Sequence, residues 1–202
     1  INNTVLSGVS LSGDRFFYEN PLAADPARNA FNASRAKGLQ EHLPILSRVK
    51  VFDCSCCPPN LLRFVGSIAD YMYSVSGNTI YAHCYMDAQG EMETSAGRMK
   101  LKQETGYPYD GKIRILTETE GACEIALHLP SWSGQWKLTI NGKEAEAVLI
   151  KGYLYVQREW KCGDCLELEL DMGIRFWESN PRVIDTSGRI AVTRGPLVFC
   201  AE

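Results

Sequence analysis

The 202-residue sequence has no excess of basic residues and no long hydrophobic run. It contains 21 lysines and arginines against 24 acidic residues, a formal net charge of −3. This balance argues against a nucleic-acid-binding protein, which usually carries a basic excess or a basic stripe. No stretch approaches the roughly 18 consecutive apolar residues that a membrane-spanning helix needs. We therefore expect a globular protein with neither a nucleic acid nor a membrane as its partner.

The sequence also lacks an initiator methionine and the basic, apolar and small-residue zones of a signal peptide. At the other end, residues 189–202 form an apolar, β-like run that stops without a polar tail. Both ends are those expected of an internal or C-terminal piece of a longer protein. The missing signal peptide therefore says nothing about the compartment.

Cysteine is too sparse for a disulfide scaffold, with eight in 202 residues, or about 4%. Three of the eight crowd into Cys54-Ser55-Cys56-Cys57. Neighbouring cysteines rarely bond each other, because the ring that they would close is strained. Such a cluster favours metal binding or thiol chemistry in a reducing compartment, here the cytoplasm. The alternative is a group of small buried hydrophobic side chains, the usual state of reduced cysteine.

The cysteine cluster is followed by the clearest helical pattern in the sequence. Pro58 and Pro59 suit the first turn of a helix, where a missing N–H does no harm. The pattern predicts a helix over residues 60–75 that ends at Ser76-Gly77-Asn78. The positive end of its dipole would favour thiolates at Cys56 and Cys57. Apolar residues recur there at spacings of three and four: Leu61, Leu62, Phe64, Val65, Ile68, Ala69, Met72 and Tyr73.

Beyond residue 76 the pattern is almost entirely that of β-strands. Asn141-Gly142 is a strong hairpin signal, and Cys162-Gly163-Asp164-Cys165 predicts another turn rather than half of a metal site. Short strands at this spacing indicate a β-sandwich. Nearer the N-terminus, Ser12-Gly13-Asp14 could be a hairpin turn between strands 5–11 and 15–18. The strand candidates beyond residue 76 are 79–85, 98–104, 112–118, 124–129, 137–140, 153–157, 166–172 and 189–199.

Few other residues suggest chemistry. His42, His83 and His128 are scattered. A structural role is the usual case for His83 and His128, which lie in strand patterns, and the sequence leaves the role of His42 open. Glu19 follows Tyr18. The Tyr18 hydroxyl could bind a sugar, or Tyr18 could be a core aromatic whose hydroxyl is hydrogen-bonded within the protein. A sugar-stacking platform is one interpretation of the sandwich aromatics, but such residues more often fill a core. These aromatics are Tyr107, Tyr109, Trp132, Trp136 and Trp160.

The segment Cys56-Cys57-Pro58-Pro59-Asn60, with the helix after it, resembles glycoside hydrolase family 127, the β-L-arabinofuranosidases. The resemblance spans essentially all 202 residues, and the Cys-Cys-Pro-Pro-Asn motif is its most specific part. Further segments agree with it: 6–13 (LSGVSLSG), 16–22 (FFYENPL), 106–111 (GYPYDG), 129–132 (LPSW), 140–142 (ING) and 194–198 (RGPLV).

This resemblance implies an α+β, multidomain fold. Residues 1–76 would be the C-terminal part of an (α/α)6-barrel catalytic domain. Residues 77–178 would form an antiparallel, jelly-roll-like β-sandwich, and residues 179–202 would begin a following β segment or domain.

The resemblance also implies a mechanism. Family members are retaining glycosidases that use a zinc-bound cysteine nucleophile on terminal β-L-arabinofuranosyl groups. By the motif, Cys56 would be the nucleophile and a zinc ligand, Cys57 a second ligand, and Tyr18 an active-site tyrosine that binds substrate. The family's acid/base glutamate and its other zinc ligands, a Glu and a Cys, lie upstream of the matched segment. We therefore expect the 202 residues alone to be inactive.

Two other functions remain open on the sequence alone. A carbohydrate-binding sandwich without catalysis would keep its sugar affinity when Cys56 and Cys57 are replaced. A thiol-redox or metal-sensor module built on Cys54, Cys56 and Cys57 would oxidise reversibly and show no sugar specificity. The first alternative shares a carbohydrate partner with the glycosidase, and the sequence does not indicate an oligomeric state.

Overall fold

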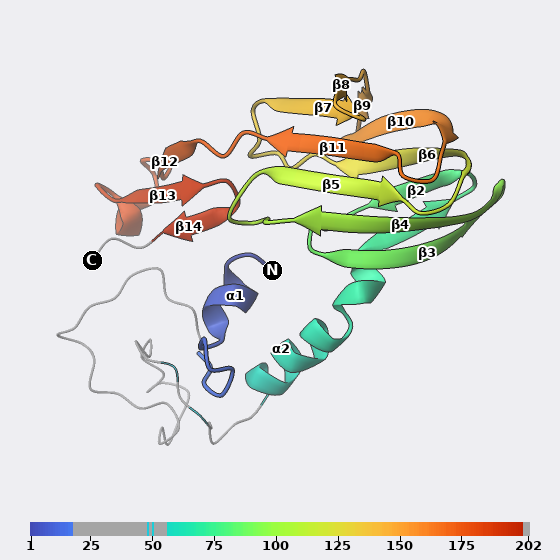
Figure 1. Cartoon of the computed structure of the whole chain (residues 1–202). Coiled ribbons are helices and arrows are strands. Elements are labelled where there is room, and N and C mark those ends of the chain that lie inside the picture. The colour runs from blue at the N-terminus through green and yellow to red at the C-terminus, as the bar shows by residue number, and fades with distance from the viewer. Residues whose placement is uncertain (18–47, 49, 51–55, 200–202) are drawn as a thin grey trace. The chain divides into compact units, whose positions relative to one another are not determined.

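The computed structural model describes residues 1–17, 48, 50 and 56–199 of the chain (Figure 1). Four residues singled out above, Tyr18, Glu19, His42 and Cys54, lie outside the described residues. The chain divides into two compact units, one of residues 1–67 and 197–202 and the other of Ile68–Pro196. No helix in the described part is long and apolar enough to span a membrane.

The first unit contains two helices. Helix α1 (Thr4–Gly8) occupies part of the segment for which a strand over 5–11 was considered, so that strand prediction is wrong. The turn itself is present, because Gly13 has φ +74° and an isolated antiparallel bridge joins Val9 to Phe16. Helix α2 (Cys57–Gly66) begins with the two prolines in its first turn, as expected.

Helix α2 ends at Gly66 rather than at residue 75. The backbone N–H of Ser67 donates to carbonyls of the last turn, including those of Arg63 and Phe64. A short 3-10 helix, η4 (Ile68–Tyr71), follows, and then strand β1 (Tyr73–Ser76). The apolar and aromatic residues of 72–75 fit a strand as well as a helix, and pairing of β1 with β2 (Thr79–Ala82) decides between them.

The second unit is built around two sheets. The five-stranded sheet has the order β1-β2-β6-β10-β9 and the six-stranded sheet the order β3-β4-β5-β11-β7-β8. The first adds β6 (Gly121–His128), β9 (Val148–Ile150) and β10 (Tyr153–Trp160) to β1 and β2. The second comprises β3 (Ala88–Thr94), β4 (Gly97–Thr105), β5 (Lys112–Thr117), β7 (Trp136–Ile140), β8 (Lys143–Glu144) and β11 (Cys165–Leu170).

The two sheets enclose one hydrophobic core, which confirms the sandwich. Strands alternate between buried and outward residues, as in β10, where Leu154 and Val156 are buried and Tyr153 and Tyr155 are half-exposed. The sheets are antiparallel, as expected, except that β2 and β6 pair in parallel. Fully buried core residues come from both sheets: Ile80, Ile125, Leu127 and Leu154 from one, and Leu101, Ile115, Leu166 and Leu168 from the other.

The segment after the sandwich is also strand-rich. Strand β12 (Ile174–Glu178) pairs antiparallel with β13 (Ile190–Arg194), and a 3-10 turn, η5 (Ile184–Thr186), lies between them in the chain. The single strand expected over 189–199 is interrupted at Gly195, whose φ is +54°, and β14 (Leu197–Phe199) follows.

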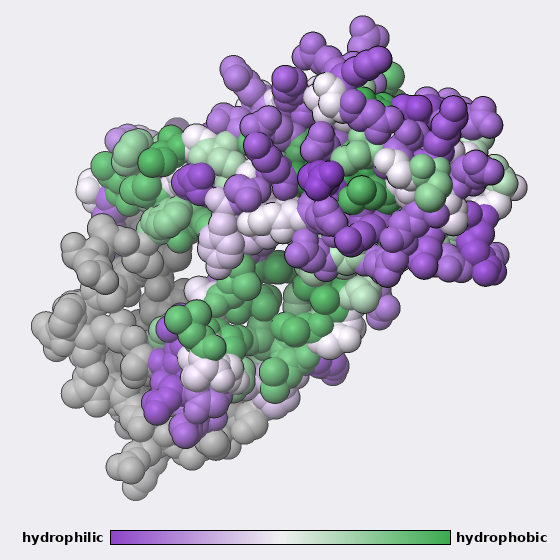
Figure 2. All heavy atoms as spheres, in the orientation of Figure 1, coloured by the Kyte–Doolittle hydropathy of each residue, from purple (hydrophilic) through white to green (hydrophobic). Residues whose placement is uncertain are grey.

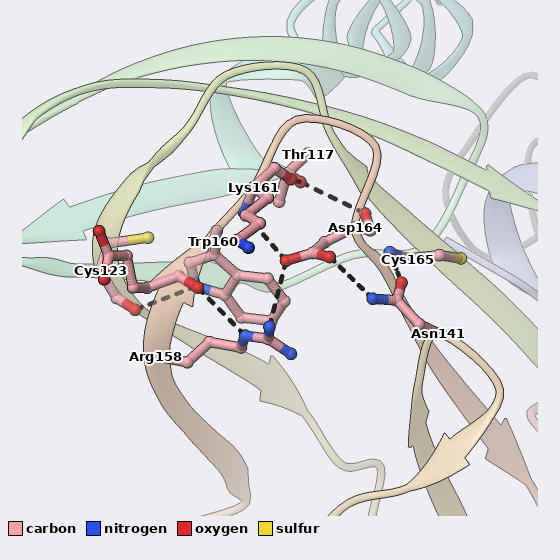
Figure 3. Close-up of polar contacts among 9 residues, drawn as sticks. Thr117, Cys123, Asn141, Arg158, Trp160, Lys161, Asp164 and Cys165 are labelled. Carbon is pink, nitrogen blue, oxygen red and sulfur yellow. Dashed lines mark hydrogen bonds and ion pairs between the residues drawn. The ribbon is translucent and has the colours of Figure 1, made fainter.

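A buried carboxylate ties two hairpin turns of the sandwich together (Figure 3). Asn141, at φ +52° in the predicted Asn-Gly turn, donates from Nδ2 to Asp164 Oδ1 over 2.7 Å. The Asp164 carboxylate also accepts the Lys161 N–H at 2.9 Å and pairs with Arg158 at 3.3 Å. The Lys161 N–H and the Asn141 amide hold the pKa of Asp164 below its usual value. Cys162 and Cys165 therefore flank a hairpin turn, as the sequence predicted.

Candidate functional site

Cys56 and Cys57 meet at the start of helix α2. Cys56 is the residue before the first helical residue, and Cys57 is that first residue. Their Sγ atoms lie 3.5 Å apart. Cys56 is exposed and Cys57 is half-buried, and neither is in a disulfide. The motif thus presents two neighbouring sulfurs in one place, with Cys56 the more accessible.

This separation fits two ligands of one zinc ion. Zinc–sulfur bonds of about 2.3 Å at a tetrahedral angle place two sulfurs about 3.8 Å apart. In an extended strand, adjacent side chains would point to opposite faces. Here both residues have helical backbone geometry or stand at its boundary, which lets the sulfurs converge. Two cysteines supply half of a tetrahedral set, and no group of three or more His, Cys, Asp or Glu within the described residues could complete one.

The first turn of α2 offers few backbone donors to a thiolate. Pro58 and Pro59 carry no N–H, and the N–H of Asn60 donates to the Cys56 carbonyl over 3.2 Å. The helix dipole still favours negative charge at this end. A bound cation would stabilise thiolates more strongly than these few donors, so the donor set favours a metal over simple anion stabilisation by the helix.

Asn60 is held by its own helix. Its Oδ1 accepts a hydrogen bond of 2.5 Å from Arg63 Nη2, one turn further along. Both side chains of this contact are exposed within the described residues. The apolar face of the helix is not covered within the described residues: Leu62 is 55% and Val65 46% exposed. Figure 2 shows apolar atoms gathered over this helix.

The other residues considered from sequence are not at this site. His83 and His128 lie on the sandwich, with His83 hydrogen-bonded between Ser74 and Tyr153. Cys162 is exposed in the hairpin turn and donates from Sγ to the Glu118 carbonyl.

The expected alternative, in which the sandwich aromatics fill the core, is confirmed for four of the five: Trp160, Tyr107, Trp132 and Trp136. Trp160 is fully buried and donates from Nε1 to the Cys123 carbonyl over 3.0 Å. Tyr107 and Trp132 stack with ring centroids 6.4 Å apart, and Tyr109 is exposed. A different aromatic group, on the outer side of β2 and β10, was missed, although Tyr81, Tyr153 and Tyr155 stand at the alternating positions of a half-buried strand.

Comparison with known protein families identifies the family of this chain. Three sequence models match successive parts of the chain. They describe the beta-L-arabinofuranosidase GH127 catalytic domain over residues 1–70, the GH127 middle domain over 79–172, and the glycoside hydrolase family 127 C-terminal domain over 174–202. The chain belongs to glycoside hydrolase family 127.

The GH127 relatives are similar over nearly the whole chain. A non-reducing end beta-L-arabinofuranosidase of Bifidobacterium longum subsp. longum is 34% identical over 99% of this chain and 30% of its own length. The crystal structure of a GH127 beta-L-arabinofuranosidase from Geobacillus stearothermophilus T6 superposes with a TM-score of 0.80 at 34% identity, over 96% of this chain and 30% of that one. A second GH127 beta-arabinofuranosidase structure has a TM-score of 0.81 at 34% identity, over 98% and 31%. The chain thus spans about a third of the length of these relatives.

Proposed function

We propose that this GH127 chain is the nucleophile-bearing part of a retaining glycoside hydrolase that removes terminal β-L-arabinofuranosyl groups. The observation that carries the proposal is the Cys56–Cys57 sulfur pair at the start of α2, inside the segment matched by the catalytic-domain model. In this proposal residues 1–76 end an (α/α)6 barrel, residues 77–178 form a jelly-roll-like sandwich, and 179–202 begin the next β segment. Carbohydrate is then the partner of the whole protein.

Retention requires two displacements at the anomeric carbon. In the first, Cys56 Sγ attacks that carbon, the S–C bond forms, and the glycosidic C–O bond breaks as an acid protonates the leaving oxygen. In the second, the conjugate base takes a proton from water, the water oxygen bonds to the same carbon, and the S–C bond breaks to return the thiolate. The acid/base is expected from a residue outside these 202 positions.

Cys56 and Cys57 would hold a zinc ion together with ligands from outside the described residues. When bound, zinc supplies the positive charge that keeps both thiols deprotonated at neutral pH, where an ordinary thiol of pKa near 8.5 is mostly protonated. The division of roles follows exposure. Cys56 is open to a sugar, whereas the half-buried Cys57 is placed to stay a ligand. Tyr18, proposed to bind substrate, lies outside the described residues.

The test uses a full-length GH127 protein that carries this chain, assayed with a chromogenic β-L-arabinofuranoside. Cys56→Ala should lower kcat by roughly 10⁴-fold or more, as loss of a nucleophile does. The product of the wild type, followed by NMR, should first appear with retained configuration. Cys162→Ala is the matched control, because Cys162 is an exposed cysteine of the sandwich turn, and its activity should stay within about twofold of wild type.

The alternatives predict different results. A kcat of Cys56→Ala close to that of wild type would contradict a cysteine nucleophile. A first product of inverted configuration would contradict it as well. Sugar binding without turnover in the wild type would favour the non-catalytic binding module. Reversible oxidation of Cys56 and Cys57 with no sugar specificity would favour the thiol-redox module.

A further inference from the structure

The two outer faces of the sandwich differ in charge. The six-stranded sheet is covered by ion pairs, such as those of Arg114 with Glu104 at 3.0 Å and with Glu167 at 3.2 Å. Figure 2 shows this side as largely hydrophilic. Outward positions of the five-stranded sheet carry no lysine or arginine in the described strands. They are Ser74, Ser76, Thr79, Tyr81, Ala122, Glu124, Ala126, His128, Val148, Ile150, Tyr153, Tyr155, Gln157 and Glu159.

Tyrosine rings close over the middle of this face. Tyr81 on β2 and Tyr155 on β10 both stand opposite Ala126 of the central strand β6. Their ring centroids are 6.0 Å apart with the planes at 90°, and Ala126 beneath them is fully buried. Tyr153 meets Tyr81 at 5.6 Å and 86°. The Tyr81 ring thus contacts both the Tyr153 and the Tyr155 rings edge to face.

Hydrogen bonds fix the neighbouring part of the face. His83 Nε2 lies 2.7 Å from Ser74 Oγ, and its Nδ1 lies 2.7 Å from Tyr153 Oη, so both ring nitrogens are bonded. The His128 ring lies 5.4 Å from that of Tyr153. Burial lowers the pKa of both histidines, which favours their neutral forms. The His83 ring is therefore held by two hydrogen bonds, and both histidines are uncharged at neutral pH.

The borders of the face are polar on one side and apolar on the other. On the β2 side, Thr79 donates from Oγ1 to Glu124 Oε2 over 2.8 Å. On the β9 side, Val148 is 62% and Ile150 49% exposed, opposite Tyr155 and Tyr153. The tyrosine face consists of Ser74, Thr79, Tyr81, His83, Tyr153 and Tyr155.

We propose that the tyrosine face binds an uncharged glycan chain, a role that rests on the proposed glycosidase function. The apolar C–H side of a sugar ring can lie against a tyrosine, while its hydroxyls bond to serine, threonine and tyrosine hydroxyls. A surface without lysine or arginine suits a neutral polyol and disfavours acidic polymers. Rings already held in place lose little entropy on binding. A protein partner would instead favour a contiguous apolar centre, which here is confined to the β9 border.

Affinity electrophoresis through gels that contain a neutral arabinofuranosyl polysaccharide tests the proposal. The full-length protein carries Cys56→Ala to prevent turnover, with excess L-arabinose present to occupy the catalytic site. Adding Tyr81→Ala and Tyr155→Ala should weaken retardation by roughly fivefold or more, as expected for the loss of two ring contacts. Tyr109→Ala, which removes a 68% exposed tyrosine elsewhere on the sandwich, is the control and should leave retardation unchanged. Equal retardation of all three proteins overturns the proposal.

A second readout needs no variant. Nitration of the wild-type protein by tetranitromethane, followed by mass spectrometry, should modify Tyr81 or Tyr155, and the polysaccharide should protect them while Tyr109 stays reactive. If neither is nitrated without glycan, another protein surface covers the face, and the proposal is wrong. If wild type does not hydrolyse a β-L-arabinofuranoside, the proposed glycosidase function is wrong. The electrophoresis and the nitration experiment would still show whether this face binds glycan.

Discussion

Cys56 Sγ lies 3.5 Å from Cys57 Sγ at the start of helix α2. Sequence adjacency alone does not bring two side chains together, because in a strand they would diverge. The helix boundary makes them converge, and it does so with prolines in the first turn that leave few backbone N–H groups for an anion. This relationship is the structural basis for proposing a shared zinc ion and a thiolate nucleophile.

Removing the carboxylate of Asp164 should destabilise the sandwich. Its side chain is only 9% exposed and accepts bonds from Asn141, Lys161 and Arg158. Asp164→Ala leaves these donors without their acceptor, and we expect a loss of about 2–4 kcal/mol. Thermal unfolding should show the sandwich transition roughly 5–10 °C lower. Glu144→Ala, an exposed carboxylate on β8, should shift it by less than about 2 °C; equal shifts would refute the structural role of Asp164.

Gly111 is predicted to tolerate no side chain. An added Cβ would overlap the Leu170 carbonyl oxygen and meet Met172, while the Leu170 N–H donates to the Gly111 carbonyl over 2.9 Å. The two backbones cannot separate without breaking that bond, so Gly111→Ala should cost about 1–3 kcal/mol. Among the described residues, a Cβ at Gly66 would meet nothing within 4 Å, which makes Gly66→Ala the control. Thermal unfolding compares the two, and an unchanged melting temperature for Gly111→Ala would contradict the close approach.

Stability should fall as the medium becomes mildly acidic. Burial lowers the pKa of His83 and His128, so the unfolded chain binds protons more readily than the folded one below the ordinary value of 6.5. This contribution is present above about pH 6.5 and is lost as the pH falls through the lowered pKa values. The double variant His83→Gln/His128→Gln should flatten the decline of melting temperature between pH 7 and 5. Parallel declines in wild type and variant would show that other groups are responsible.

The sandwich was largely predictable because its signals are local. All eight strand candidates beyond residue 76 overlap observed strands, although the last is divided at Gly195. Alternation of the kind seen at Leu166 and Leu168 reflects one buried and one wet face, and Asn141-Gly142 adopts the left-handed backbone of its turn. Strand β3 was missed because outward Glu91 and Glu93 and the glycine at 90 leave too little apolar alternation to detect.

The helix boundary and the aromatic groups were less predictable because tertiary pairing decides them. Residues 72–75 carry apolar side chains compatible with either period, and only pairing with β2 selects a strand. The tyrosine face combines residues of strands β2 and β10, which are distant in sequence. The pattern of neither segment alone therefore predicts it. The roles of Cys56 as nucleophile and of Tyr18 as a substrate contact, as well as zinc itself, stay predictions.

Zinc content distinguishes a metal site at Cys56 and Cys57 from the alternatives. The full-length protein is purified without added chelator, and zinc per chain is measured by mass spectrometry for wild type and for Cys56→Ala/Cys57→Ala. We expect about one zinc per wild-type chain, a near-complete loss in the double variant, and full retention in Cys162→Ala. Equal zinc in wild type and double variant, or no zinc in either, would contradict a metal site at this motif.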